Sequence, residues 1–217
     1  MSPNSANRGI EGRRAAGFTL IEVLVVLTII AAIISIAVPV YVGVQDNKNV
    51  TLCKANMKTL ATAMEQYRQR FKRYPSHRSG IQFLLAPYRE KMVEHLEKTI
   101  RNMYICPGDD FAVQALGDWQ ETYGDLDNLD PEAISYAGRN SKEYPLRRKN
   151  AGSEVVACDA GGTDGTEVNH RHIINVAYLD MSVGNFDVVD LPEKDEKNFE
   201  VGPNSPIEAL QKLNKDN

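Results

Sequence analysis

The sequence predicts an α+β protein in which a long N-terminal helix packs against a small antiparallel sheet. Three observations lead to this fold class. Residues 18–38 are almost wholly apolar, and residues 50–71 carry an apolar stripe at helical spacing. Four short segments rich in β-branched or aromatic residues then follow between residues 133 and 189. The expected shape is a lollipop, with a helical stem and an α+β head.

The composition is that of one soluble domain with an N-terminal extension. The chain has 217 residues and a formal net charge of −4. This mild acidity, with no large basic face, argues against a nucleic-acid binder. The basic clusters are interpreted as a solvated helix end and a loop, and they comprise Arg68, Arg70, Lys72, Arg73, His77 and Arg78, then Arg147, Arg148 and Lys149.

The apolar segment is long enough to cross a bilayer. Residues 1–17 are polar and basic, and basic flanks stay cytoplasmic, so the bulk of the chain is expected to be exported. A secretory signal peptide would have a shorter apolar core and a small-residue cleavage site after it. A plain anchor does not explain Glu22, because a charge at that depth costs about 2.5–3.5 kcal/mol on insertion scales.

Gly17-Phe18-Thr19-Leu20-Ile21-Glu22 resembles the prepilin cleavage and methylation motif of type IV pilins and type II secretion pseudopilins. The resemblance implies that prepilin peptidase cuts between Gly17 and Phe18 and methylates the new amine of Phe18. It also implies that Glu22 pairs with the N-terminal amine of a neighbouring subunit, which would offset its cost in lipid. Pro39 matches a proline that the family often places in this helix. The alternative is that Glu22 reaches the interface from a simple anchor helix.

The stem helix is predicted to continue past Pro39, with a kink, to the ending signal at Tyr74-Pro75-Ser76. From Phe18 to Phe71 it would be about 80 Å long. One face carries the apolar stripe Val50, Cys53, Met57, Leu60, Met64, Tyr67 and Phe71, which should face the head. A coiled coil is the weaker interpretation, because the stripe covers fewer than four heptads.

The three cysteines, Cys53, Cys106 and Cys158, allow one disulfide and a spare thiol, or none. An exported head makes a bridge plausible, but spacing does not reveal the pair. Cys53 either packs as a buried apolar side chain or forms a disulfide with Cys106.

The head begins with one or two short helices over residues 81–103, interrupted by Pro87. Residues 109–133 are acidic and rich in turn residues, and Asp125, Asp127 and Asp130 offer oxygens that suit Ca²⁺. The spacing is not that of an EF-hand, so a solvated acidic loop is favoured. Some pseudopilins hold calcium in a C-terminal loop, so calcium remains an alternative here; no other cofactor is expected.

The predicted strands are residues 133–138, 154–160, 172–180 and 183–189, and the last two should form a hairpin. Residues 191–217 are polar and are expected to be largely mobile. Ser205-Pro206 could begin a short helix through Leu213, with Ile207, Leu210 and Leu213 on one side.

A second, narrower resemblance is to a large pilin-like group with a Cys-x-x-Asn-Leu-Lys stem. Its further patches are "YICPGDD", "ISYAG" and "NHRHIINVAYLDMSVGNF", the last similar to an H-x9-D-G signature. This makes His170 the histidine and Asp180 the aspartate, and the two are expected to hydrogen-bond across the hairpin. Met181 replaces the family glycine, which suits a tight turn with positive φ, so we expect a turn of another type.

An enzyme is not expected, because the sequence has no nucleophile elbow, zincin, P-loop or dinucleotide motif. The competing interpretation is a membrane-anchored metal-binding or hydrolytic domain. Its donors would come from Asp159, Asp164, His170, His172 and Asp180, whose side-chain types suit a transition metal.

Together these inferences divide the chain into five parts: a cleaved leader (1–17), a transmembrane and filament-core helix (18–44), the amphipathic half of the stem (45–74), a globular α+β head (75–190) and a polar tail (191–217). The resemblance implies a subunit of a type II secretion pseudopilus, with a type IV pilus, as a major or minor pilin, as the alternative. The implied partners are copies of itself, other pilin-like subunits, prepilin peptidase and an inner-membrane assembly platform. The expected location is the inner membrane with a cytoplasmic N-terminus and a periplasmic head, and later a periplasmic or extracellular filament.

Overall fold

The structure is a computed structural model that describes residues 18–76, 78–147, 150–161, 167–170, 173–187, 201–205 and 207–214. The chain divides into two compact units, Met1–Gly43 and Val44–Asn217, and each is described by itself. Several residues singled out from the sequence lie outside the described residues: Gly17, His77, Arg148, Lys149, Asp164 and His172.

Helix α1 runs from Leu20 to Phe71, which confirms the predicted stem. It continues through Pro39, as expected for a proline within an apolar helix. In the first unit, its large apolar side chains are exposed from Phe18 to Val42. Among the described residues, α1 is the one helix long and apolar enough to cross a membrane, by length and composition.

The second half of α1 carries the predicted buried stripe. Five of its seven residues, Val50, Cys53, Met57, Leu60 and Met64, are buried, since a spacing of three and four residues keeps them on one helical face. The last two, Tyr67 and Phe71, are only partly buried. The helix ends at Phe71, and Lys72 follows with a φ of 59°. A left-handed residue directly after the last turn is a common way to terminate a helix.

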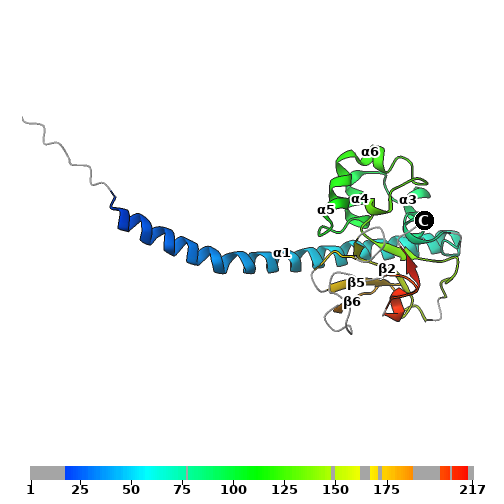
Figure 1. Cartoon of the computed structure of the whole chain (residues 1–217). Coiled ribbons are helices and arrows are strands. Elements are labelled where there is room, and N and C mark those ends of the chain that lie inside the picture. The colour runs from blue at the N-terminus through cyan, green and yellow to red at the C-terminus, as the bar shows by residue number, and fades with distance from the viewer. Residues whose placement is uncertain are drawn as a thin grey trace, which may run out of the picture. The chain divides into compact units, whose positions relative to one another are not determined.

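Within the second unit, short helices and a sheet flank this half of α1 (Figure 1). The α-helices are α2 (Gly80–Leu84), α3 (Ala86–Arg89), α4 (Glu97–Tyr104), α5 (Asp110–Ala115) and α6 (Trp119–Thr122). Short 3-10 turns cover Leu116–Asp118, Pro131–Ala133 and Glu208–Leu210.

Two expectations for this helical layer are corrected. Pro87 lies in the first turn of α3, where its missing N–H costs nothing, so it starts a helix and does not interrupt one. The acidic stretch 109–133 is not all loop, because it contains α5 and α6. Asp109 caps α5 by accepting a hydrogen bond from the backbone N–H of Ala112 (3.0 Å).

The main sheet is antiparallel with the strand order β6-β5-β2-β1-β7. Its strands are β1 (Ala137–Arg139), β2 (Val155–Cys158), β5 (Ile173–Tyr178), β6 (Val183–Asp187) and β7 (Leu213–Asn214). The predicted β5–β6 hairpin is confirmed, and an irregularity between Val155 and Ala157 marks a bulge in β2. A separate pair joins β3 (Ala160–Gly161) to β4 (Glu167–Val168).

Apolar side chains gather in two buried clusters. The inner core joins the stripe of α1 to the short helices and to sheet residues such as Val156, Ala157 and Ala177. The outer core joins sheet residues such as Val155 and Ile174 to a set from the C-terminal segment: Val201, Leu210 and Leu213. The sheet therefore has apolar packing on both faces.

The C-terminal segment differs from its prediction. The expected helix from Ser205 through Leu213 is a 3-10 turn at Glu208–Leu210 followed by strand β7. Leu213 and Asn214 pair with Arg139 and Gly138 of β1. The apolar spacing therefore predicted burial correctly and a helix wrongly, since three apolar residues cannot distinguish a helix from a turn followed by a strand.

Helix α2 approaches β1 through two glycines. A Cβ on Gly138 would lie 2.1 Å from the carbonyl oxygen of Gly80, a separation that no side chain can accept. Gly80 itself has a φ of 56°, in the left-handed region that favours glycine. This close approach sets the distance between the helical layer and the sheet.

Candidate functional site

Two places carry the residues singled out from the sequence: the start of α1 and a buried cluster between α1 and the sheet. At the start of α1, Thr19 and Glu22 form a reciprocal cap. The N–H and the hydroxyl of Thr19 both donate to Glu22 Oε2 at 2.8 Å, and the N–H of Glu22 donates to Thr19 Oγ1 at 3.4 Å. This is a capping box, which satisfies helix N–H groups that have no partner within the helix.

The capping box explains how a single chain tolerates Glu22 near the start of the helix. Phe18 is described and is 85% exposed, and Gly17 lies outside the described residues. A chain that began at Phe18 would still contain both Thr19 and Glu22. The cap is therefore compatible with cleavage, and the sequence reasoning missed it although T-x-x-E before an apolar run is a known signal.

The buried cluster consists of Cys53 of α1, Cys106 after α4, Asp159 after β2 and His170 before β5. One ligand-type atom from each residue lies within 4.8 Å of those of the other three. His170 Nε2 lies 3.3 Å from both Cys106 Sγ and Asp159 Oδ2, and Cys53 Sγ lies 3.2 Å from Asp159 Oδ2. All four residues are at most 2% exposed.

Local structure fixes each member of the cluster. Cys106-Pro107-Gly108-Asp109 is a turn closed by the Asp109 N–H to the Cys106 carbonyl (3.0 Å), with Pro107 and Gly108 at its two central positions. A Cβ on Gly108 would lie 2.6 Å from the carbonyl oxygen of Asn169, so glycine allows the turn to lie directly against the His170 segment.

Asp159 is held from the neighbouring strand. The backbone N–H of Asn175 in β5 donates to Asp159 Oδ1 at 2.5 Å, and its side-chain amide donates to Asp159 Oδ2 at 2.6 Å. The backbone N–H of Asp159 in turn donates to the Asn175 carbonyl (3.1 Å). The carboxylate is thus fixed in direction before it meets Cys53 and His170.

The cluster has strongly shifted protonation equilibria. Burial raises the pKa of Cys53 well above its ordinary value and also raises that of Asp159. The hydrogen bond from Cys53 lowers the pKa of Cys106 to about 7. Burial is the largest influence on His170 and opposes its charged form, yet Asp159 and Cys106 together outweigh it and raise the pKa of His170 to about 10. Such a set of shifts is typical of a functional site.

The predicted pairing of His170 with Asp180 is wrong. The two residues flank the six-residue strand β5, which spans about 20 Å, so they lie at its opposite ends. His170 meets Asp159, whereas the exposed Asp180 accepts hydrogen bonds from the N–H (2.9 Å) and the hydroxyl (2.6 Å) of Ser182.

The turn after β5 is of another type than a tight two-residue turn, yet it keeps one positive φ. Met181 has a φ of 69°, so it adopts the positive φ that the family glycine would provide. The Met181 N–H donates to the Tyr178 carbonyl (3.0 Å) and the Tyr178 N–H donates to the Ser182 carbonyl (2.9 Å). This is a three-residue hairpin loop whose last residue is left-handed, a geometry that selects glycine but can be forced on another residue.

The three cysteines are buried, and none of them is joined to another by a disulfide. Cys53 and Cys106 lie side by side in the cluster, whereas Cys158 packs in the outer core. Of the two alternatives for Cys53, a buried side chain or a disulfide with Cys106, the structure has the first, with Cys106 close by and no covalent bond between them.

The acidic residues proposed for calcium have local roles. Asp125 accepts hydrogen bonds from the Asp127 N–H (3.1 Å) and the Asn128 amide (2.8 Å). Asp127 forms an ion pair with Arg89 at 2.9 Å, and Asp130 caps the following 3-10 turn through the Glu132 N–H (2.9 Å). Calcium binding by these residues stays a prediction.

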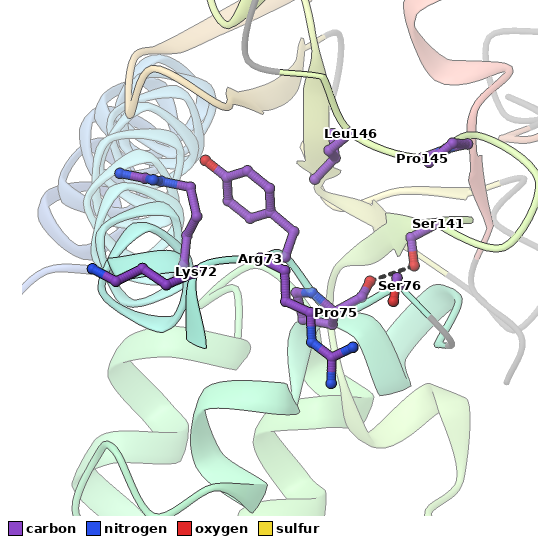
Figure 2. A pocket seen from close by; sticks show the side chains of 9 residues that line it. Lys72, Arg73, Pro75, Ser76, Ser141, Pro145 and Leu146 are labelled. Atoms are coloured by element: carbon purple, nitrogen blue, oxygen red, sulfur yellow. Dashed lines mark hydrogen bonds between the residues drawn. The ribbon is translucent and has the colours of Figure 1, made fainter. Parts of the chain in front are cut away.

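A pocket of about 330 Å³ lies at the end of α1, where part of the predicted basic cluster gathers (Figure 2). Lys72 and Arg73 line one part of it, and Pro145 and Leu146 line another. Ser141 Oγ donates to the Pro75 carbonyl at 2.6 Å and joins two parts of the wall. Its described lining combines cationic, hydroxyl and apolar side chains.

The apolar helix with its Thr19–Glu22 cap, together with an α+β unit built on the second half of that helix, defines a type IV pilin-like protein. Residues 12–38 match the family model of the prokaryotic N-terminal methylation motif, and residues 41–115 match that of type II secretion system protein G. Together these two matches support a type IV pilin-like pseudopilin. Its apolar N-terminal helix and this family indicate a membrane anchor.

Individual relatives agree with this family. The chain is 33% identical to the type II secretion system core protein G of Pseudomonas aeruginosa over 76 residues, 35% of this chain and 54% of the relative. It is 26% identical to that of Klebsiella pneumoniae over 141 residues, 63% of this chain and 99% of the relative. It is also 36% identical to the type IV major pilin protein PilA of Myxococcus xanthus over 76 residues, 35% of this chain and 34% of the relative.

These matches have clear limits in length. The chain spans about half the length of the Pseudomonas aeruginosa relative, 54%. No solved structure matches the chain significantly.

Proposed function

We propose that this chain is a structural subunit that polymerises into a type II secretion pseudopilus. The observation that carries the proposal is the pairing of a methylation motif over residues 12–38 with a protein G match over residues 41–115. The exposed apolar side chains of Phe18–Val42 would pack against those of other subunits once the helices bundle. Small residues within this segment, Ala31, Ala32, Ser35 and Ala37, permit close helix approach.

The proposed maturation involves a cut between Gly17 and Phe18 by prepilin peptidase, followed by methylation of Phe18. The chain would sit in the inner membrane with its N-terminus in the cytoplasm until an assembly platform adds it to a filament. There Glu22 would neutralise the N-terminal amine of a neighbour. The head would have no chemistry of its own, so the role is mechanical.

Intact mass tests the proposal directly. The protein is purified from membranes of a host with an active prepilin peptidase and, as a matched control, from a host lacking it. The expected mass in the first host is that of a chain beginning at methylated Phe18. A full-length mass in both hosts would overturn the proposal and leave residues 18–44 as a plain anchor for the metal-binding or hydrolytic alternative.

A type IV pilus subunit is the second candidate, favoured by the similarity to the Myxococcus xanthus pilin. The two candidates differ in what disappears when the protein is lost. A pseudopilin mutant would stop secreting proteins across the outer membrane and keep its surface fibres. A pilin mutant would lose fibres visible by electron microscopy and continue to secrete.

A further inference from the structure

We propose that Cys53, Cys106, Asp159 and His170 form a closed, tetrahedral zinc site that ties the stem helix to the head. The site is independent of filament assembly and goes beyond the proposed function. Its donors come from four separate segments: α1, the turn after α4, the end of β2 and the approach to β5.

The distances within the cluster fit a tetrahedron of zinc ligands. Bonds of about 2.3 Å to sulfur and about 2.0–2.1 Å to nitrogen or oxygen, at tetrahedral angles, give separations of about 3.3–3.8 Å between donors. The measured separations are 3.3 Å for Cys106 Sγ to His170 Nε2, 3.3 Å for His170 Nε2 to Asp159 Oδ2 and 3.2 Å for Cys53 Sγ to Asp159 Oδ2. A small outward shift would admit the ion.

The donor types select the metal. Two thiolates, one imidazole and one carboxylate suit a borderline-soft cation such as Zn²⁺, whereas Ca²⁺ and Mg²⁺ require oxygen ligands. Four protein ligands fill a tetrahedral shell, and the site is fully buried, so no position remains for water or substrate. The ion would therefore have a structural role.

The surroundings already provide the outer contacts that such a site needs. The ring of His170 presents Nε2 to the cluster and Nδ1 toward Asp46 Oδ1 at 3.6 Å, the carboxylate–histidine arrangement common at zinc ligands. Nδ1 is buried and has no closer hydrogen-bond partner among the described residues. The Gly108 N–H donates to Cys106 Sγ at 3.4 Å, and Tyr136 Oη lies 3.6 Å from Cys53 Sγ. Both contacts would stabilise thiolates.

Zinc content is the first test, measured on the whole chain, with its N-terminal helix, in detergent micelles. Purified under reducing conditions with zinc supplied, the protein should carry about one zinc per chain. Cys53→Ser and Cys106→Ser should each reduce this to less than about a tenth. Cys158→Ser is the matched control and should retain the ion, because Cys158 packs in the outer core and lies outside the cluster.

Cobalt substitution keeps the test decisive if the serine variants do not fold. The wild-type chain loaded with Co²⁺ should show thiolate-to-cobalt charge-transfer absorption and the intense visible bands of tetrahedral cobalt. Added zinc should remove these bands, whereas added calcium should leave them unchanged.

The alternative fate of the two thiols is a disulfide, which an oxidising compartment would permit. A Cys53–Cys106 disulfide in protein taken directly from membranes, found by peptide mapping, would overturn the proposal. So would a folded, fully reduced chain that binds neither zinc nor cobalt. Zinc that survives in a folded Cys106→Ser variant would overturn it as well.

Discussion

Glu22 shows how one side chain can have two roles at the residue scale. In the single chain its carboxylate closes a cap with Thr19, which offsets part of the cost of a charge in an apolar helix. The proposed charge pair with a neighbour's amine is a separate interaction. The two roles depend on different properties, hydrogen-bond acceptance and charge.

Glu22→Gln separates these roles, because glutamine can also serve in a capping box but has no charge. The variant should insert and be cleaved normally but should assemble as poorly as Glu22→Ala. The measurement is the yield of sheared filaments for wild type, Glu22→Gln and Glu22→Ala at equal membrane levels. Normal assembly of Glu22→Gln together with failure of Glu22→Ala would assign the role to capping.

Met181 is the second informative residue, because its φ of 69° is strained for a side chain with a Cβ. Met181→Gly should raise the free energy of unfolding by about 0.5–1 kcal/mol, since it relieves that strain. Unfolding in urea can be followed through the fluorescence of the single tryptophan, Trp119, which packs against the inner core. Met181→Ala removes the long side chain but keeps the strain, so it should give no such gain.

At the scale of the element, the end of α1 is fixed by an ion pair that responds to acid. Glu65 accepts from Arg68 Nε (2.7 Å), from a second guanidinium nitrogen (2.5 Å) and from the Tyr74 hydroxyl (3.0 Å). The hydrogen bonds from Arg68 are the main cause that lowers the pKa of Glu65 to about 2. The pair therefore favours the folded state only while the carboxylate is ionised.

A lowered pKa gives stability that is present above the unfolded value, about 4.5, and lost as the pH falls toward about 2. Between about pH 5 and pH 3, the wild-type chain should thus lose more stability than Glu65→Gln, which has nothing to titrate at this position. Urea midpoints at several pH values would measure the difference. Parallel pH curves for the two proteins would contradict the assigned role of Glu65.

At the scale of the whole molecule, the head is organised around two apolar layers on either side of one sheet. The outer layer depends on the C-terminal segment, and Leu210 within it is fully buried. Leu210→Ala should lower the free energy of unfolding by about 2–5 kcal/mol, through lost burial and the cavity that remains. Leu96→Ala is the matched control, because Leu96 is 49% exposed and should change stability by less than about 0.5 kcal/mol. Equal effects of the two variants would show that the outer layer contributes little.

Much of this architecture could be predicted from the sequence. The stem helix has a strong apolar period of 3.6 residues, and the β5–β6 hairpin has two β-branched or aromatic segments separated by a short turn; both are confirmed. The outer core could not be predicted, because Leu210 and Leu213 are too few to define a period. The burial of Arg139 could not be predicted either. It is 2% exposed, and its hydrogen bonds to the Glu154 carboxylate and the Val155 carbonyl depend on the folded arrangement of the strands.

The candidate site was predicted in part. The sequence named all four residues but placed them in separate hypotheses: Cys53 and Cys106 in a disulfide, and Asp159 and His170 among the donors of a metal-binding or hydrolytic domain. Their convergence depends on packing between segments more than a hundred residues apart, such as Cys53 and Asp159. The resemblance to an H-x9-D-G signature suggested Asp180 as the partner of His170, because a sequence pattern of this kind expresses only pairs that lie close along the chain.

The short edge strands of the main sheet affect how closely the heads of several copies can lie together. Strand β7 has two residues, and β6 at the other edge has five, with Asn185 held by Lys54 of α1 through a hydrogen bond of 3.1 Å. Free strand edges are templates on which a second chain can add, and short or covered edges suppress this. Heads concentrated along the proposed filament would meet each other constantly, and the described part of this sheet would offer them little unpaired backbone to join. In that filament, copies would come together through their helices without fusing into a continuous sheet.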